Sequence, residues 1–501
     1  MENIFKKQFF ILLCLLIFVP VMTRADNVGQ QQNFFVDPGY TSTTKTQISA
    51  TLVRNSDKAY FYIDNDWLNQ RTEKEKESLY SVLSTLGKEF DSNIYAQLTS
   101  VFGSEAMPGI DRDTRVTILL HSMKENTRGY IRTVDGYEKI VNPLSNQREM
   151  IYLNIDNLTN PLMKSFLAHE FMHLITLNQK DLMRGVSEQV WLNEARAEYA
   201  VTLLGYNNET DSSYLANREK LFIDNSSDSL VIWNKTTADY GVTSIFIHYL
   251  VDQYGLPVLT NSLKSKQVGI ASLNEAITGI SPQNNFNTAF TNFTIAAYLN
   301  DCTLSSAYCF KDKNLKDFHV LSFSNFLPFS GESNLNLGQN LKNYSAHWQK
   351  FSGGTGNLKI VFKNQSAGKF SVPYILKNVD GTSVVKFLKI DSTKTGELIV
   401  PNINQDVISV IMIPSLQIQD SNSTADYSYS ITASSFVDNG IDSEDNVDNN
   451  SDNNNDSNID LPFTTDKPLN QMNREELLIV ILRLIINLIL QGRTLPLSAL
   501  T

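Results

Sequence analysis

A charged pentapeptide inside an apolar run constrains the fold of this chain more than any other feature. The sequence HEFMH, from His169 to His173, lies within the run from Ser165 to Leu177, which predicts a buried helix. Residues four apart share one face of a helix, so the two histidines can bind one metal ion together. Glu170, one position further round, would then face a water molecule on the metal and accept its proton. The motif therefore predicts a metal site on the buried face of a helix.

A catalytic zinc ion needs three protein ligands and one open position, so the two histidines require a third ligand. Glu194 is the best candidate, because it follows His173 by 21 residues, which lets the chain turn and return on a second helix. The other known design places a third histidine shortly after the motif, but Thr176 and Gln179 stand where it needs Gly and His. The sequence therefore predicts Zn²⁺ as the cofactor, bound by His169, His173 and Glu194.

The motif HEFMH and the later stretch WLNEARAEYA at residues 191–200 resemble the gluzincin metallopeptidases, the thermolysin-like superfamily. Within it, the chain looks most like the hyicolysin-type bacterial family. The resemblance covers roughly Val116 to Gly255. It implies that Glu194 is the third ligand and that Glu198, four positions further on, supports a ligand histidine through a hydrogen bond. Here the chain departs from thermolysin, which has Ser-Asp where this chain has Ala197 and Glu198.

The resemblance also implies a phenol or imidazolium that stabilises the oxyanion formed when water attacks a peptide carbonyl. Tyr240 is the candidate by its position downstream of the third ligand, at the start of a predicted helix from Ala238 to Tyr254. His248 is the second candidate. The competing interpretation is structural, with Tyr240 as a helix-start aromatic and His248 as a packed core histidine, and for His248 it is the favoured one. His121, at the end of a predicted strand, is expected to be a hydrogen-bonded residue rather than a ligand.

The expected fold class is α+β. By the resemblance, a gluzincin-like catalytic domain with a mixed sheet and a helical lobe spans residues 51–325. Local patterns place strands at 59–63, 115–120 and 150–154 and a helix at 75–90. Two interpretations stay open for residues 146–154: an exposed edge strand that pairs with extended substrate, as the resemblance implies, or one more core strand.

Residues 336–436 show a different pattern, in which apolar residues alternate with polar ones and turn residues recur at short intervals. This pattern predicts an all-β sandwich domain. Asp380 and Gly381 predict a hairpin turn between two of its strands. The candidate strands are residues 358–362, 372–376, 384–390, 398–400, 407–413 and 427–432.

The first 25 residues have the pattern of a signal peptide. Lys6 and Lys7 precede an apolar run, and residues 23–25 offer small side chains for cleavage. A membrane anchor is the alternative, but the run is shorter than the roughly 20 residues that a spanning helix needs. The mature protein is therefore expected to be secreted or held at the cell surface. Residues 26–50 are polar and are expected to form an exposed leader.

Cys302 and Cys309 are the two cysteines that remain once the signal peptide is removed. In an exported protein, two cysteines seven positions apart predict a disulfide that closes a small loop. A metal or redox site of the CxxC type would be spaced more tightly, so the structural interpretation is favoured.

The composition changes twice near the C-terminus. Residues 437–471 are rich in Asp, Asn and Ser, which predicts a disordered acidic linker. A calcium loop is the alternative there, but the Gly and Glu of an EF-hand are missing. Residues 472–491 return to a strongly apolar helix, too short and interrupted to span a bilayer. Such a helix is expected to self-associate, dock on a partner or lie on a membrane surface, and we favour helix association.

Together these features predict a secreted zinc endopeptidase that hydrolyses peptide bonds in protein or peptide substrates by metal-activated water. The alternative is a surface binding or adhesion protein with an inactive gluzincin-like domain. The intact HExxH motif and Glu194 favour the enzyme, since an idle site has no physical reason to keep buried ionisable groups. The formal net charge is −11, and Lys and Arg are not clustered, so a nucleic-acid partner is not expected.

Overall fold

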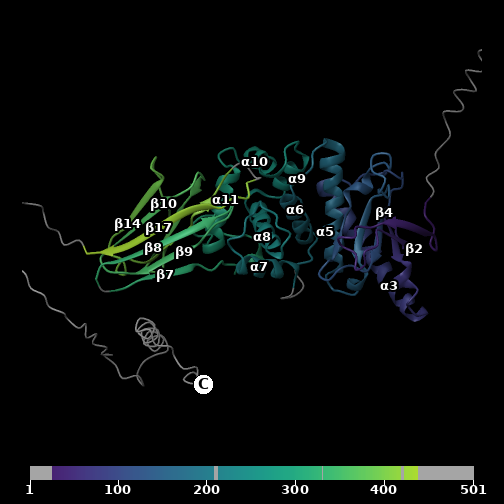
Figure 1. The fold of residues 1–501 in the computed structure, drawn as a ribbon, viewed down its shortest axis with the longest axis horizontal. Coiled ribbons are helices and arrows are strands. Elements are labelled where there is room, and N and C mark those ends of the chain that lie inside the picture. Colours follow the sequence, from purple (N-terminus) through teal and green to yellow (C-terminus); the bar gives the residue numbers. More distant parts are fainter. Residues whose placement is uncertain (1–24, 208–212, 330, 419–422, 438–501) are drawn as a thin grey trace, which may run out of the picture. The chain divides into compact units, whose positions relative to one another are not determined.

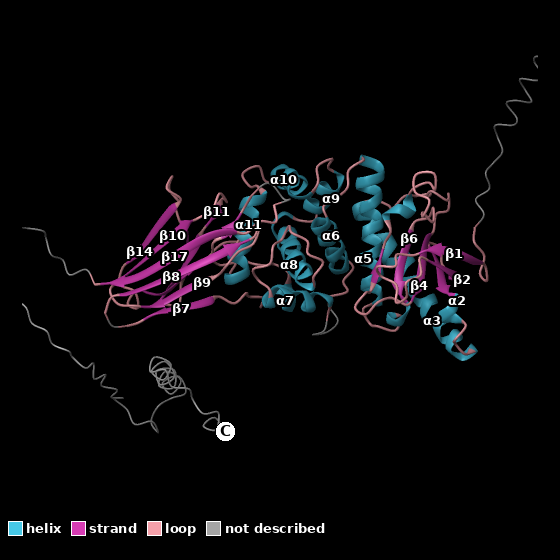
Figure 2. Ribbon diagram, viewed as in Figure 1, coloured by secondary structure: helices cyan, strands magenta, loops and turns pink. Residues whose placement is uncertain are grey.

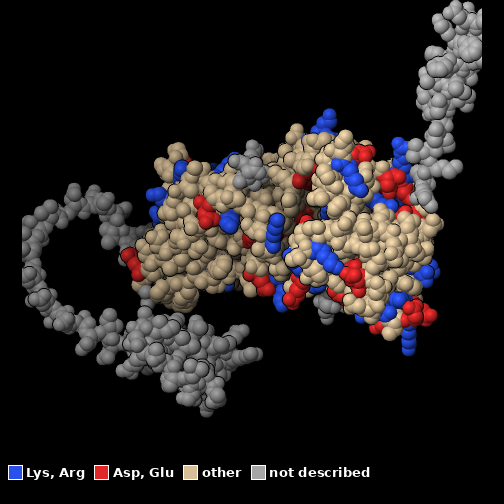
Figure 3. Space-filling model, turned by 45° about the vertical axis from the view of Figure 1, so that its right-hand side comes forward, with Lys and Arg blue, Asp and Glu red and all other residues tan. Residues whose placement is uncertain are grey.

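The computed structural model describes residues 25–207, 213–329, 331–418 and 423–437. The expected signal peptide up to residue 24, the acidic linker beyond residue 437 and the apolar helix at 472–491 lie outside the described residues. Within the described ranges, no helix combines the length and the hydropathy that crossing a bilayer requires. On the face shown in Figure 3, basic side chains are scattered among acidic ones rather than gathered into one patch.

A six-stranded mixed sheet forms the first part of the chain (Figure 1). Its strand order is β1-β2-β3-β4-β6-β5; β4 is parallel to both β3 and β6, and the other pairs are antiparallel. Helices connect β3 to the parallel strand β4, whereas the chain between β4 and β6 contains β5 and one short 3-10 turn. The elements are β1 (Gln31–Phe35), β2 (Gln47–Asn55), β3 (Ala59–Asp64), α2 (Asn65–Leu68), α3 (Glu73–Glu89), α4 (Ala96–Phe102), β4 (Val116–His121), β5 (Gly129–Tyr130) and β6 (Met150–Asn154).

Residues 26–50, expected to be an exposed leader, instead contribute β1 and the first part of β2 to this sheet. All five residues of β1 pair with β2. The polar side chains that suggested a leader belong to an edge strand, where Gln31 and Asn33 are exposed while Phe34 is fully buried. Asp26 is also buried and forms an ion pair with Arg148. Ordered structure therefore begins about 25 residues earlier than the polar composition indicated.

A helical lobe follows the sheet, and α5 lies between the two (Figure 1). One face of the sheet and the helices share a single apolar core that includes Phe61, Ile118, Phe171 and Phe246. The expected helix from Ala238 to Tyr254 is present as α8, and the lobe comprises α5 (Met163–Thr176), α6 (Val190–Leu203), α7 (Tyr214–Asp224), α8 (Thr237–Tyr254), α9 (Pro257–Lys264), α10 (Gly269–Ile280) and α11 (Phe286–Leu299).

The C-terminal part of the described chain is rich in strands (Figure 2). Two sheets, of order β14-β10-β17-β8 and β13-β12-β15-β9-β7, enclose a core shared by both. The strands are β7 (Phe323–Leu327), β8 (Ser333–Leu341), β9 (Gln349–Gly353), β10 (Asn357–Asn364), β11 (Phe370–Ser371), β12 (Pro373–Asn378), β13 (Ser383–Phe387), β14 (Thr395–Val400), β15 (Val407–Met412), β16 (Ser415–Leu416) and β17 (Tyr427–Phe436).

The sandwich differs from its expected limits at the N-terminal side. β7 precedes residue 336, and it extends one sheet by pairing in parallel with β9. Its side chains are mostly exposed and therefore lack the alternation that marked the other strands. The expected turn at Asp380 and Gly381 joins β12 to β13, with Gly381 at a positive φ of 86°.

Trp348 connects the sandwich to the helical lobe by donating from Nε1 to the carbonyl oxygen of Thr294 at 2.9 Å.

Candidate metal centre

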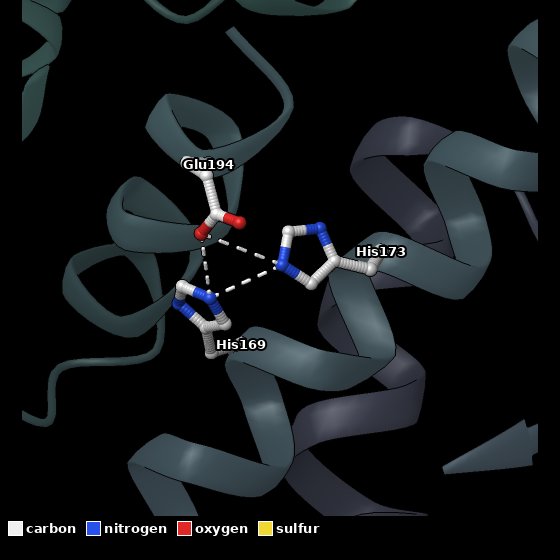
Figure 4. Close-up of side chains that lie close together, drawn as sticks. All are labelled: His169, His173 and Glu194. Carbon is white, nitrogen blue, oxygen red and sulfur yellow. Dashed lines mark hydrogen bonds and ion pairs between the residues drawn. The ribbon is translucent and has the colours of Figure 1, made fainter. Parts of the chain in front are cut away.

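Helices α5 and α6 bring three side chains to one point (Figure 4). The Nε2 atoms of His169 and His173 lie 3.1 Å apart. Glu194 Oε2 lies 3.1 Å from the first nitrogen and 3.6 Å from the second. A tetrahedral zinc ion with bonds of 2.0 to 2.1 Å would separate its ligands by about 3.3 Å. The triangle therefore has the size that such an ion requires.

The other ring nitrogen of each histidine meets an acceptor, which sets the tautomer. His173 Nδ1 lies 3.1 Å from Asn193 Oδ1, and His169 Nδ1 lies 3.5 Å from Glu198 Oε1. With the proton on Nδ1, each Nε2 presents a lone pair to the triangle. Two lone pairs and a carboxylate oxygen repel one another at these distances unless a proton or a cation lies between them. The donor set thus fits a divalent cation that accepts nitrogen and oxygen ligands.

Electrostatics in the site follow from burial and from this close grouping. Burial alone would raise the pKa of Glu194, but the adjacent imidazoles of His173 and His169 outweigh it and hold that pKa well below its usual range. Burial opposes the charge on His173, yet the carboxylate of Glu194 raises its pKa to about 9. Burial raises the pKa of Glu170 above its ordinary value, while the two histidines oppose that shift. The carboxylates of Glu194 and Glu170 therefore differ in proton affinity although they are neighbours.

A fixed network lies behind His169. Glu198, fully buried on α6, accepts from Arg218 Nε at 2.7 Å and Nη2 at 2.9 Å, and from the hydroxyl of Tyr214 at 2.7 Å. That hydroxyl also lies 3.3 Å from His169 Nδ1. The expected placement of Glu198 beside a ligand histidine agrees with this geometry. A charged fork of two hydrogen bonds holds the carboxylate in one orientation, which in turn orients the imidazole.

Glu170 packs against the edge strand of the sheet, at Gly129. A Cβ atom added to Gly129 would lie 2.8 Å from Glu170 Cγ, 2.9 Å from the carbonyl oxygen of Tyr152 and 3.0 Å from Glu170 Oε1, so its neighbours would have to move. Gly129 belongs to β5, which is the open edge, whereas β6 pairs on both sides. Residues 150–154 are thus a core strand, and the edge interpretation for 146–154 does not hold. The strand beside Glu170 is β5, two residues long and too short to show any period.

Tyr240 lies near this group, on the first turns of α8. Burial, followed by the carboxylates of Glu194, Glu198 and Glu170, raises its pKa well above the ordinary value. Its ring contacts Trp233 edge-on at 4.9 Å and lies under the guanidinium of Arg218 at 4.8 Å. The hydroxyl has no hydrogen-bond partner among the described residues. It is therefore protonated at neutral pH and can donate.

The remaining candidate residues lie elsewhere. His248 is buried between α6 and α8, with Nε2 at 2.7 Å from Thr202 Oγ1 and Nδ1 at 2.7 Å from the carbonyl of Ser244. His121 contacts the hydroxyl of Tyr130 at 3.2 Å, and burial lowers its pKa to about 4. Both contacts are those of packed, neutral histidines. Cys302 and Cys309 form a disulfide with a Cα separation of 5.0 Å, remote in sequence from the triangle.

The sequence patterns did not single out four residues that shape the centre. Asn193 could have been noticed, because it immediately precedes Glu194 and so shares the start of α6. Tyr214 and Arg218 lie on the separate helix α7, and no local spacing connects them to the motif. Gly129 lies 41 residues before Glu170. Only the folded sheet brings Gly129 next to Glu170.

Comparison with known proteins finds a curated relative over part of the chain. No protein-family model matches it. The neutral metalloprotease ShpI of Staphylococcus hyicus is 27% identical over 257 residues, which cover 44% of this chain and 53% of that protein. The chain thus spans about half the length of this curated relative.

Two solved structures are similar over smaller parts of the chain. The pre-peptidase C-terminal domain of a collagenase from Bacillus anthracis is 9% identical with a TM-score of 0.17 and covers 23% of this chain and 96% of that chain. The lysozyme inhibitor PliG of Aeromonas hydrophila is 9% identical with a TM-score of 0.16, covering 23% and 98%. Scores this low say nothing about the fold.

Proposed function

We propose that the chain is an exported zinc-dependent endopeptidase of the gluzincin type. The observation that carries this proposal is the triangle of His169, His173 and Glu194, with ligand atoms 3.1 to 3.6 Å apart and Glu170 one position along the same helix. The similarity to a neutral metalloprotease supports it independently. Protein or peptide substrates follow from the proposal.

The chain's own groups would do the following. Bound Zn²⁺ would polarise the substrate carbonyl and lower the pKa of the attacking water. Glu170 would accept the proton of that water and pass it to the leaving amine; its raised pKa brings it nearer to that of an effective base. Tyr240 would donate its unpartnered hydroxyl to the oxyanion. Glu198 would keep His169 in the tautomer that presents Nε2.

The open edge of β5 offers a place for the substrate backbone. The amide of Asn154 donates to the carbonyl of Arg128 at 3.0 Å, so Arg128 turns its backbone groups toward β6. Alternate residues of an antiparallel strand face opposite sides, so the N–H and C=O of Gly129 point to the open edge. An extended peptide would pair there, next to Glu170. This arrangement would seat a peptide bond beside the metal ligands.

The other segments complete the proposal. Residues 1–25 would direct export, and residues from 26 to about 322 would form the catalytic domain, with β1 as part of its sheet. Residues 323–437 would form an accessory sandwich. Residues 437–471 would act as a linker to the apolar helix at 472–491, which would associate with a second helix.

Cleavage of casein by the chain from Asp26 onward, beside its Glu170→Gln variant, tests the proposal. Glu170→Gln keeps size and helix but removes the base, and should lower activity by about 10²- to 10⁴-fold while zinc content stays at one ion per chain. Glu77→Gln, an exposed change on α3, is the matched control and should cleave as the parent does. Removal of zinc by a chelator should abolish activity, and zinc should restore it. Equal activity of parent and Glu170→Gln would refute the assigned base. A zinc-loaded parent that cleaves nothing would favour a binding protein.

A further inference from the structure

Three tyrosine rings form a column that runs across the sheet to its open edge. Tyr152 on β6 and Tyr130 on β5 are cross-strand partners, and their rings stack at 4.5 Å with an interplanar angle of 5°. Tyr40 stacks on Tyr130 at 4.7 Å and 21°. Because Tyr152 covers one face of Tyr130, Tyr40 covers the other. Each step is about the spacing of neighbouring strands, so the ring of Tyr40 lies one strand position beyond β5.

Tyr40 is held in place although it belongs to a loop. Asp37 begins a tight turn in which Tyr40 N donates to the Asp37 carbonyl at 3.0 Å and Gly39 N donates to Asp37 Oδ1 at 2.7 Å. Lys124 N donates to the Tyr40 carbonyl at 2.9 Å, and Asp37 N donates to the hydroxyl of Tyr130 at 3.3 Å. The ring nevertheless stays 43% exposed. A fixed, half-exposed aromatic surface loses little entropy when a ligand packs on it.

The ring of Tyr40 lies close to the candidate metal centre, through Tyr130 and Gly129. Tyr130 adjoins Gly129, whose backbone faces the open edge and touches Glu170. Side chains of a strand point alternately to the two faces of the sheet. A substrate residue opposite Gly129 would thus point toward α5. The place one strand beyond Tyr130 on the other face is taken by the ring of Tyr40, so the substrate side chain that reaches this ring would be the one opposite Arg128, which points to the same face. The carboxylates of Glu170 and Glu194 also contribute to a raised pKa of Tyr40, after burial and Asp37, as expected for a ring near the centre.

We propose that the exposed face of Tyr40 is one wall of a substrate subsite that accepts an aromatic or other large apolar side chain, one residue from the position opposite Gly129. This inference rests on the proposed function. The segment before residue 50 would thereby take part in specificity. An aromatic side chain on Tyr40 gains both buried apolar area and ring stacking, so a preference of roughly tenfold over alanine is expected at that substrate position.

Cleavage-site profiling on a randomised peptide mixture tests the inference, with Tyr40→Ala, Tyr40→Phe and Tyr80→Ala compared with the parent. Tyr80 lies on α3, which packs against β2 rather than β5, and serves as a control. The parent should enrich aromatic or large apolar residues at one position near the cleaved bond. Tyr40→Ala should lose that roughly tenfold preference, with a larger loss of rate on peptides that carry an aromatic residue there than on peptides that carry alanine. Tyr40→Phe and Tyr80→Ala should keep the preference.

Two results would overturn it: an unchanged preference in Tyr40→Ala, or faster cleavage of bulky residues, which would make Tyr40 a barrier. Binding gives a readout that does not need turnover. The zinc-loaded Glu170→Gln variant should bind a fluorescent peptide with phenylalanine at the enriched position about tenfold more tightly than its Tyr40→Ala double variant does. If the parent cleaves nothing, the proposed function fails, and the same pair is measured with extended peptides that carry phenylalanine or alanine at successive positions. A tenfold difference in affinity would then support the subsite, and equal affinity would refute it.

Discussion

Removal of Arg218 should weaken metal binding from a distance. Arg218 donates through two nitrogens to Glu198 and through Nη2 to the hydroxyl of Tyr214 at 3.0 Å. The side chain of Glu198 is 0% exposed and that of Arg218 is 18% exposed. In Arg218→Met the carboxylate of Glu198 would remain buried with only Tyr214 and His169 as partners. Without the two-pronged hydrogen bond, the carboxylate of Glu198 would be held less firmly, and so would the imidazole of His169 beside it.

The expected magnitude follows from this geometry. Breaking a buried ion pair by removing one partner costs about 3 to 5 kcal/mol. Because Arg218 is partly exposed, we expect a loss near the lower end of that range. The free energy of unfolding of the metal-free protein should fall by about 3 kcal/mol. Loss of groups that orient a metal-binding histidine weakens metal binding by about 10- to 100-fold. That range corresponds to roughly 1.4 to 2.8 kcal/mol.

Two measurements check these values: urea unfolding of the metal-free chain and zinc affinity by competition with a chromophoric chelator. Arg218→Lys keeps the charge but loses the two-pronged hydrogen bond, so its zinc affinity should fall between those of the parent and Arg218→Met. Lys220→Met, an exposed change on the same helix, should match the parent. A folded Arg218→Met protein whose zinc affinity lies within twofold of the parent would refute the idea that Glu198 acts through His169.

Three further predictions concern other parts of the catalytic region. Gly129→Ala should lower kcat at least tenfold with zinc content unchanged, because its methyl group would displace Glu170; full activity would contradict the packing described. Glu188→Gln should lower the free energy of unfolding by about 3 to 5 kcal/mol in urea, since Arg196, 2.7 Å away and fully buried, loses its counter-charge. Burial, followed by the carboxylate of Asp111, raises the pKa of Glu149 to about 7. The protonated side chain therefore contributes to stability below the ordinary carboxyl pKa, and this contribution is lost as the pH rises through 7. Between pH 5 and 8 the free energy of unfolding of Glu149→Gln should therefore rise by up to about 3 kcal/mol relative to that of the parent. A difference in stability that does not change with pH would contradict this prediction.

The spacing of the motif predicted that His169, His173 and Glu194 come together, because most of that information is local. Two histidines four residues apart share a helix face whatever surrounds them, and Glu194 lies within the next helix. The strands β3, β4 and β6 and the helix α3 were predicted within two residues for the same reason, since each shows its own apolar period. A disulfide between Cys302 and Cys309 was likewise expected from spacing alone.

The edge strand and the first strand escaped prediction for physical reasons. β5 contains only Gly129 and Tyr130, and two residues cannot show alternation. β1 is polar because it is an edge strand with one face toward solvent, so its Gln and Asn residues resemble those of an exposed leader. In both cases the partner strand creates the element: β2 pairs with β1 through all five residues, and β6 pairs with β5.

The groups behind the ligands show why the remainder of the centre needs the fold. Tyr214 and Arg218 reach Glu198 because α7 packs against α8 and so returns to α6, a contact that no spacing along the chain encodes. The three candidate ligands lie on one helix pair, α5 and α6, whereas the groups that orient His169 include residues of a third helix, α7. A substitution on α7 can therefore leave all three side chains in place and still lower metal affinity, because Glu198 orients the imidazole of His169 less firmly without its partners on α7.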